Sequence, residues 1–349
     1  MQLIYDLNLI DLENYFVSKG IKPFRAKQIF KWLYEKKVTS FDDMSDISKD
    51  TILMLKEDFY IDGLKVKDKQ VSSDGTIKYL FELKDGAFVE SVMMVFDYGF
   101  SACLSSQVGC NMGCNFCASG LLKKQRDLNV GEIVLQALTI SKHLEDRNER
   151  LGNIVLMGTG EPFDNYDNVM KALSIINSPY GLEIGARHIS ISTCGVVPMI
   201  NRFSLENVQY NLAISLHAAN NELRNKLMPI NRAYPLEVLF DALKDYSIRN
   251  NRRLTFEYLL LKDVNDSKKD VEDIKKLLSG MNAYINLIPY NNVDEREYES
   301  SSEENALRFY DLLKKANIAV TLRQKRGVDI DAACGQLRAK AMKWWSILH

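Results

Sequence analysis

Short apolar runs alternate with amphipathic stretches along the second half of the chain, and this alternation restricts the possible folds more than any other feature. Runs typical of β-strands occur at Asn153–Met157, His188–Thr193, Tyr210–Leu216, Leu254–Leu260, Tyr284–Ile288 and Ile318–Leu322. Stretches with helical periodicity lie at Val130–His143, Tyr166–Ile176, Ser267–Leu278 and Glu304–Lys315. The pattern predicts an α/β fold with a parallel sheet, open or closed into a barrel, and chemistry at the carboxyl ends of its strands.

The first quarter of the chain has a different pattern. Helical spacing of apolar residues begins after Pro23 and continues through Thr51–Phe59. The segments Thr76–Leu83 and Ala87–Phe96 then alternate as paired strands do. We therefore expect a small helical accessory domain and linking strands in residues 1–90, and a catalytic domain in residues 91–349.

Polar or glycine-rich segments follow four of the predicted strands. They are GTGEP (Gly158–Pro162), STCG (Ser192–Gly195), SLHA (Ser215–Ala218) and PYNN (Pro289–Asn292). One such loop would be ordinary, because loops are generally polar. Four at one edge of a parallel sheet indicate a ligand site.

Three cysteines lie close together in GCNMGCNFC, where Cys110, Cys114 and Cys117 have the spacing C-x₃-C-x₂-C. Compact thiolate sites bind zinc or iron–sulfur clusters. Structural zinc takes four ligands, and the nearest further cysteine, Cys103, belongs to no C-x₂-C pair. Three thiolates suit a cubane cluster with one iron left open. A non-catalytic zinc-stapled RNA-binding protein is the alternative from another class.

Composition bears on location and partners. The chain has no charged-then-apolar leader at Met1 and no run of about 18 apolar residues, which predicts a cytoplasmic protein without membrane contact. Its net charge of −1 argues weakly against nucleic-acid binding. Basic residues nevertheless cluster at Lys22–Lys37, Lys123–Arg126, Arg249–Arg253, Arg323–Arg326 and Arg338–Lys343. These clusters favour a polyanionic partner.

The cysteine spacing, followed by β/α alternation, resembles the radical S-adenosylmethionine (SAM) superfamily. The resemblance implies a partial (β/α)₆ TIM-like barrel and a [4Fe–4S] cluster held by Cys110, Cys114 and Cys117. It also implies that SAM binds the open iron through its amino and carboxylate groups and is cleaved to a radical. GTGEP resembles the superfamily's loop for the SAM amino group.

Three longer motifs resemble one family, the dual-specificity 23S rRNA and tRNA adenine-C2 methyltransferases called RlmN. They are CLSSQVGCNMGCNFCASG (Cys103–Gly120), LMPINRAYPL (Leu227–Leu236) and GVDIDAACGQLRAK (Gly327–Lys340). In addition, Phe24–Tyr34 resembles part of the family's N-terminal RNA-binding domain. The resemblance implies methylation of adenine 2503 in 23S rRNA and of adenine 37 in some tRNAs. It also implies a monomer and an electron donor such as a flavodoxin system.

The family's chemistry assigns roles to residues outside the cluster. Cys334 corresponds to the cysteine that takes a methyl group from one SAM and, after radical formation from a second SAM, carries it to the base. Cys103 corresponds to the resolving cysteine, which releases the product by forming a disulfide with Cys334. Glu90 corresponds to the proton acceptor. The implied SAM contacts are Gly160, Glu161, Ser192, Ser215, Leu216, His217 and Asn291.

Two questions stay open at this level. The sister activity that methylates C8 of the same rRNA adenosine, of the Cfr type, uses the same five cysteines, although QVGC and NRAYPL are nearer to the C2 family. The loop Leu121–Leu128 departs from the family pattern at Gln125 and Asp127, so its part in substrate binding is undefined.

Overall fold

The computed structural model describes residues 1–330 and residue 332. Its strands are β1 (Gln2–Leu3), β2 (Phe59–Tyr60), β3 (Leu64–Val71), β4 (Ile77–Leu83), β5 (Phe88–Phe96), β6 (Gly99–Cys103), β7 (Gln107–Val108), β8 (Arg126–Asp127), β9 (Leu151–Leu156), β10 (Ile189–Thr193), β11 (Asn211–Ser215), β12 (Leu254–Leu260), β13 (Ala283–Pro289) and β14 (Ala319–Leu322). Its α-helices are α1 (Leu9–Ser18), α2 (Arg25–Phe30), α3 (Lys49–Asp58), α4 (Val130–Glu145), α5 (Tyr166–Asn177), α6 (Val197–Phe203), α7 (Asn221–Leu227), α8 (Leu236–Asn250), α9 (Lys268–Leu277) and α10 (Glu303–Lys315). None of these helices has both the length and the apolar character needed to cross a membrane.

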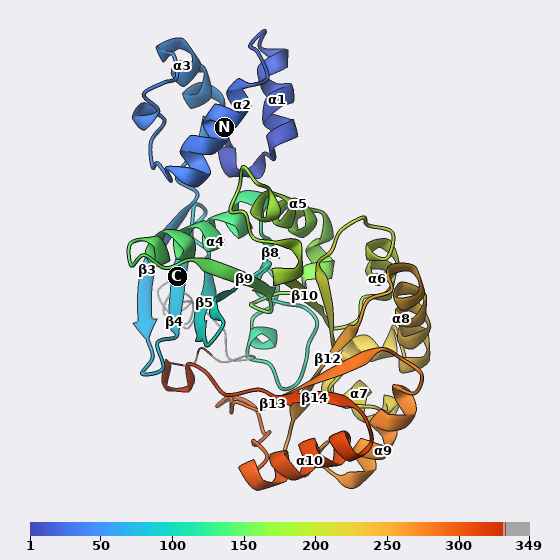
Figure 1. Cartoon of the computed structure of the whole chain (residues 1–349). Helices are drawn as coiled ribbons and strands as arrows, with labels where there is room; N and C mark the ends of the chain where they lie inside the picture. Colours follow the sequence, from blue (N-terminus) through green and yellow to red (C-terminus); the bar gives the residue numbers. More distant parts are fainter. Residues whose placement is uncertain (331, 333–349) are drawn as a thin grey trace.

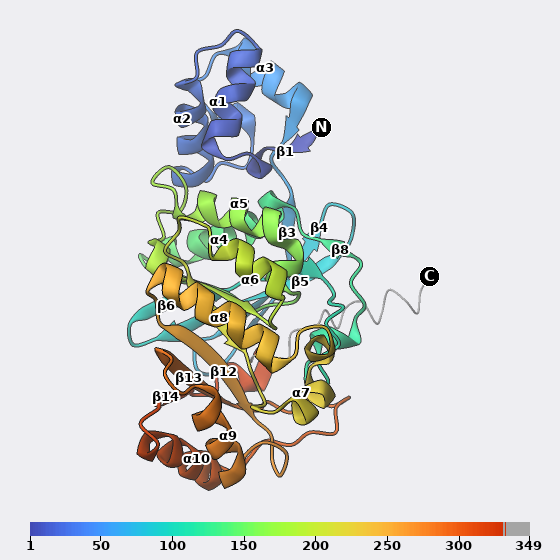
Figure 2. The same cartoon turned by 90° about the vertical axis from the view of Figure 1, so that its right-hand side faces the viewer.

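The main sheet has the strand order β14-β13-β12-β11-β10-β9-β6-β5-β4-β3 within the described residues. From β6 to β14 every neighbouring pair is parallel. Figure 1 shows helices covering the outside of this curved sheet, and Figure 2 shows α4, α5, α6 and α8 following one another along one flank. The predicted α/β partial barrel is confirmed.

Alternating side chains explain why the interior of the curved sheet is polar. On β10, Ile189 and Ile191 are buried in the apolar core, whereas Ser190 and Ser192 line cavities inside the barrel. Glu257 likewise points inward from β12. Because side chains alternate between the faces of a strand, the apolar face packs against the helices and the polar face is left for a ligand.

The strands that precede the cysteine motif continue the same sheet. β3, β4, β5 and β6 are antiparallel neighbours, and Val92 of β5 lies opposite Cys103 of β6. The expected pairing of Thr76–Leu83 with Ala87–Phe96 is therefore observed as β4 and β5. The division of the chain at residue 90 stays a prediction.

The N-terminal helices form a separate group at one end of the molecule (Figure 1). The apolar residues that follow Pro23 at helical spacing are buried: Ala26, Ile29, Phe30 and Leu33. Helix α1 begins with a capping box between Asn8 and Asp11. Contact with the barrel includes a hydrogen bond from the Gly131 N–H at the start of α4 to Asp6 Oδ1, at 2.8 Å. The group therefore rests on the helical layer.

Candidate functional site

The loop that carries Cys110, Cys114 and Cys117 lies between β7 and β8, and backbone contacts fix its path. The Asn115 N–H donates to the Leu227 carbonyl at 2.9 Å. The Tyr290 hydroxyl donates to the Phe116 carbonyl at 3.0 Å, and Arg296 Nη2 donates to the Cys117 carbonyl at 2.9 Å. Two segments that are distant in sequence, one at Leu227 and one that contains Tyr290 and Arg296, therefore position the cysteine loop.

All three cysteines line one pocket, which holds about 900 Å³ including its mouth. Five of the predicted SAM contacts line the same pocket: Gly160, Glu161, Ser192, Ser215 and His217. Leu216 is fully buried beside it, and Asn291 lines the adjoining pocket. Within the described residues, no three His, Cys, Asp or Glu side chains converge tightly enough for a single metal ion. The pocket's size suits a small-molecule ligand.

Burial strongly raises the pKa of two thiols of this loop. It raises the pKa of Cys110 to about 11 and raises the pKa of Cys114 above its ordinary value. Apolar neighbours, including Phe116 and Met228, surround the loop. Since thiolates in such surroundings need a cationic partner, metal binding would deprotonate them and release protons.

The segment GTGEP follows β9 and is hydrogen-bonded to the chain at the end of β10, beside the pocket. Glu161 Oε2 accepts a hydrogen bond from the Cys194 N–H at 2.8 Å, and Oε1 accepts one from the Phe163 N–H at 3.0 Å. Gly160 has a φ of +108°, and a Cβ there would lie 2.7 Å from the Gln107 Cβ. Only glycine allows this close approach of the loop to β7.

His217 is held in one protonation state at the pocket wall. Its Nδ1 accepts a hydrogen bond from the Leu259 N–H at 3.1 Å, and its ring lies edge-on to Phe116. Burial, with nearby Arg224 adding to the effect, lowers the pKa of His217 to about 3. The ring is therefore neutral at physiological pH, with its proton on Nε2.

Arg224 is a residue of this site that the sequence did not indicate. It is only 1% exposed, and its guanidinium donates to the carbonyls of Cys194, Ser215 and Leu216 at 2.8, 3.1 and 3.2 Å. A further nitrogen, Nη1, donates to Asn231 Oδ1 at 2.9 Å. One cation thus joins the ends of β10 and β11 to the segment after α7.

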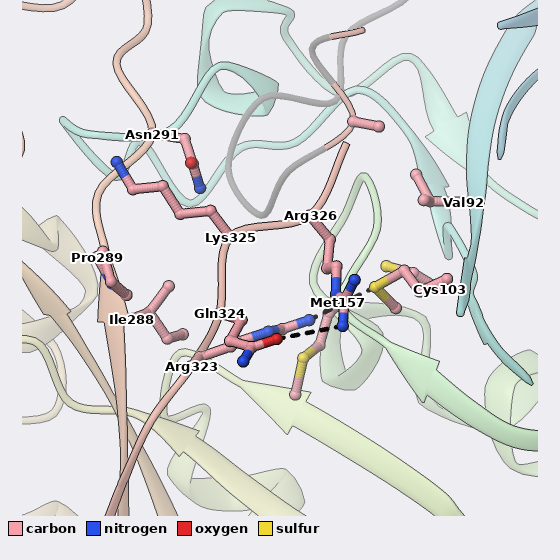
Figure 3. A pocket seen from close by; sticks show the side chains of 12 residues that line it. Val92, Cys103, Met157, Ile288, Pro289, Asn291, Arg323, Gln324, Lys325 and Arg326 are labelled. Carbon is pink, nitrogen blue, oxygen red and sulfur yellow. Dashed lines mark hydrogen bonds between the residues drawn. The ribbon is translucent and has the colours of Figure 1, made fainter. Parts of the chain in front are cut away.

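Cys103 lines a second pocket of about 460 Å³ that adjoins the first. Met157 and Ile288 line both pockets, so two side chains separate Cys103 from the cysteine loop's cavity. Figure 3 shows Arg323 and Arg326 beside Met157 and Cys103, with Lys325 extended toward Asn291. The basic segment Arg323–Arg326 was predicted only as part of a charge cluster.

Glu90 lies on β5 on the same strand face as Val92 and Met94, which line the Cys103 pocket. Its carboxylate is buried, and Oε1 lies 3.8 Å from Nζ of the buried Lys78. The structure therefore brings Glu90 and Cys103 to neighbouring strands, with Lys78 as a partner that the sequence did not single out. Cys334 lies outside the described residues.

Polar contacts hold the loop Leu121–Leu128 against its neighbours. Asp127 accepts a hydrogen bond from Gln107 Nε2 at 2.8 Å and pairs with Lys124 at 2.9 Å. Arg126 forms two hydrogen bonds with Glu132, at 2.7 and 2.8 Å. The unusual Asp127 therefore has a structural part, because it joins the loop to the strand before the cysteines.

Glu257 should make the free energy of unfolding depend on pH. Burial raises the pKa of Glu257 to about 7 from 4.5, although Arg323 and Asn286 act in the opposite direction. The folded protein therefore keeps a proton that the unfolded chain loses, so the free energy of unfolding falls as pH rises from about 4.5 to about 7. Glu257→Gln should raise stability at pH 8 by up to about 3 kcal/mol and change it little at pH 4.5.

Thermal unfolding from pH 4.5 to pH 8 measures this effect, with the exposed Glu57→Gln on α3 as the control. A stability gain for Glu257→Gln that does not vary with pH would contradict the assignment.

Comparison with known proteins places the chain in a class. Residues 104–278 match the radical SAM superfamily, and residues 3–61 match the family described as ribosomal RNA large subunit methyltransferase N-terminal domain. The crystal structure of a radical SAM methyltransferase from Sphaerobacter thermophilus superposes with a TM-score of 0.94 at 40% identity, covering 97% of this chain and 100% of that one. Fold and site thus define a radical SAM methyltransferase.

Closely similar sequences narrow the class to one family. A probable dual-specificity RNA methyltransferase RlmN of Streptococcus thermophilus strain CNRZ 1066 is 52% identical over 97% of this chain and 89% of its own length. Its counterpart in Streptococcus pyogenes serotype M5 strain Manfredo is also 52% identical, over 97% of this chain and 96% of its own length. The chain belongs to the RlmN family.

Membership implies a [4Fe–4S] cluster and SAM, and the chain's residues fit both. Three partly buried thiols line one cavity with an apolar surround. Two buried polar atoms near the cavities, Ser106 Oγ and Asn291 Oδ1, have no hydrogen-bond partner among the described residues. Such unsatisfied groups are expected where a polar ligand binds.

Proposed function

We propose that the chain methylates C2 of adenine in RNA, at adenine 2503 of 23S rRNA and at adenine 37 of some tRNAs. Cys110, Cys114 and Cys117 would hold the cluster. The residues that would contact SAM are Gly160, Glu161, Ser192, Ser215, Leu216, His217 and Asn291. When bound, the cluster supplies the electron that converts SAM into a radical. An electron donor such as a flavodoxin system, a monomeric state and a cytoplasmic location complete the proposal.

Carbon 2 of adenine is electron-poor and cannot attack the methyl group of SAM directly. The chain would solve this with Cys334, whose sulfur takes up a methyl group and then carries it, after hydrogen abstraction, to C2. Glu90 would accept the proton that leaves C2, and the surplus electron left on the adduct would return to the oxidised cluster. The Cys103 thiolate would then attack the Cys334 sulfur. The carbon–sulfur bond would break toward carbon, and the released carbon would take up a proton to become the methyl group.

The shared wall of the two pockets is the observation that carries this proposal. Met157 and Ile288 line both the cavity of the cysteine loop and the cavity of Cys103. A radical formed in the first cavity would therefore have only a short path to a methyl group in the second. Glu90, on the strand next to Cys103, supports the same location for the base.

Product mapping tests the proposal. Anaerobically reconstituted protein should be brown, with absorbance near 400 nm, and should convert adenine to 2-methyladenine in purified 23S rRNA and tRNA. Mass mapping locates the methyl group. An 8-methyl product would establish the Cfr-type reaction, which the RlmN relatives do not favour. A colourless protein with stoichiometric zinc would refute the radical mechanism.

A further inference from the structure

The turn between β3 and β4 forms hydrogen bonds with Gly327 and Asp329, which precede Cys334 in the sequence. Asp329 accepts hydrogen bonds from the Ser72 hydroxyl and, at 3.1 Å, from the Ser73 N–H. In the other direction, the Gly327 N–H donates to Asp74 Oδ2 at 3.0 Å. Two aspartates, one on each segment, thus bind the other segment's donors. We call Ser72–Asp74 together with Gly327 and Asp329 the clasp.

Both carboxylates are held in their charged form. The Ser72 hydroxyl, followed by the Ser73 N–H, lowers the pKa of Asp329. Burial alone would raise the pKa of Asp74, but the N–H groups of Thr76 and Gly327 outweigh it and lower this pKa to about 2. Hydrogen bonds to a charged acceptor are stronger than neutral ones, so both aspartates are in the stronger accepting form at neutral pH.

Ala332 lies beyond the clasp and beside Cys103. The Ala332 N–H donates to the Gly327 carbonyl at 2.9 Å. Ala332 is 6% exposed and packs in one apolar cluster with Cys103, Val92 and Met94. A Cβ at Gly327 would lie 2.8 Å from the Ala332 Cβ and 2.9 Å from a Thr76 methyl carbon, so this crossing requires glycine.

We propose that the clasp is a positioning device for the proposed chemistry, which docks the C-terminal segment on the β3–β4 turn and so keeps Cys334 within reach of Cys103. Asp329 is its central positioning residue. This inference rests on the proposed roles of Cys103 and Cys334. It adds a structural reason why the two thiols come within reach of each other. Two peptide units span at most about 7 Å, so covalent geometry limits how far Cys334 can lie from a fixed Ala332.

The number of residues between Cys334 and the nearest anchored position sets how much the clasp should speed the encounter of Cys334 with Cys103. Five positions separate Asp329 from Cys334, whereas twelve separate Cys334 from the end of β14 at Leu322. The chance that a flexible tether brings its ends together falls roughly as the −3/2 power of its length. Opening the clasp should therefore slow the encounter of Cys334 with Cys103 about fourfold, and more where Ala332 also leaves its apolar contacts.

Disulfide trapping in the cluster-loaded protein tests the clasp. Under anaerobic conditions diamide accepts two electrons and two protons from the paired thiols, and mass mapping of unreduced peptides quantifies the Cys103–Cys334 disulfide. We expect Asp329→Ala to slow this reaction and Asp74→Ala/Asp329→Ala to slow it at least about fourfold. Asp329→Asn keeps one acceptor oxygen and should restore part of the rate. Asp68→Ala, at an exposed position of β3, is the matched control.

Alkylation of Cys103 by a small reagent separates positioning from a loss of thiol reactivity, since its rate should stay equal or rise where Ala332 leaves Cys103, whereas the disulfide rate falls. Should the double variant fail to load its cluster, Ser72→Ala and Asp329→Asn still provide the comparison. Equal disulfide rates in the unaltered and clasp variants would overturn the proposal, as would an unaltered chain that forms no such disulfide. Failure of the proposed function would instead be seen as absent RNA methylation in the unaltered holoenzyme.

Discussion

Cys103→Ala is expected to stop turnover and leave RNA covalently attached to the protein. If Cys334 carries the methyl carbon to adenine, the base stays bonded to that sulfur until a second thiol attacks it. Cys103 is placed for this role at the end of β6, in the pocket next to the cysteine loop. The adduct should appear as a protein band that shifts on nuclease treatment, with yield approaching one RNA per active chain.

Two further cysteine variants make the result specific. Cys334→Ala should give neither adduct nor product, because the carrier sulfur is gone. Cys194→Ser removes a buried thiol that lines the first pocket rather than the second, and it should release product without an adduct. Normal multiple turnover by Cys103→Ala would show that the resolving role belongs elsewhere.

The barrel was predictable from the sequence because its strands have a clear pattern. The predicted strand Leu254–Leu260 coincides with β12, and those near β9, β10, β11, β13 and β14 agree to within two residues. Strand β6 was not predicted, since Gly99–Cys103 is short and begins with glycine. Helix α6 has only seven residues with a proline near its start, which gives too little periodicity to detect.

Residues expected to contact a ligand could be predicted from the sequence, whereas buried residues that support them could not. The cysteine spacing and the strand-end loops indicated one pocket, and the structure brings five predicted SAM contacts and all three cysteines into it. Lys78 and Arg224 were missed because an isolated basic residue in an amphipathic segment is normally solvent-exposed. Their burial depends on how strands and loops meet in the folded chain, where Lys78 lies beside Glu90 and Arg224 donates to carbonyls at the ends of two strands, and no local pattern contains this.

Arg224→Met should be the most destabilising substitution at the pocket rim. The side chain is 1% exposed and donates to three carbonyls and one amide oxygen. Methionine has a similar length but no donors, so four buried acceptors would lose a partner. We expect a loss of about 3 kcal/mol or more in the free energy of unfolding, and a fall in Tm of roughly 4 °C or more.

The same substitution should weaken SAM binding beyond its effect on stability. Arg224 holds the carbonyls of Ser215 and Leu216, so its loss would release the segment that leads into His217. Because His217 has a φ of +57°, its conformation depends on this support. Calorimetric titration of the cluster-loaded protein with SAM, well below Tm, should show at least a tenfold weaker Kd.

Arg232→Met, at an exposed position of the neighbouring segment, is the control and should change neither Tm nor Kd. Arg224→Lys distinguishes charge from geometry. Lysine keeps the cation, but a single ammonium group cannot reach carbonyls on β10 and β11 and the Asn231 oxygen together. Its Kd should therefore resemble that of Arg224→Met. If Arg224→Lys bound SAM normally, charge rather than the joining of strand ends would be the property that matters.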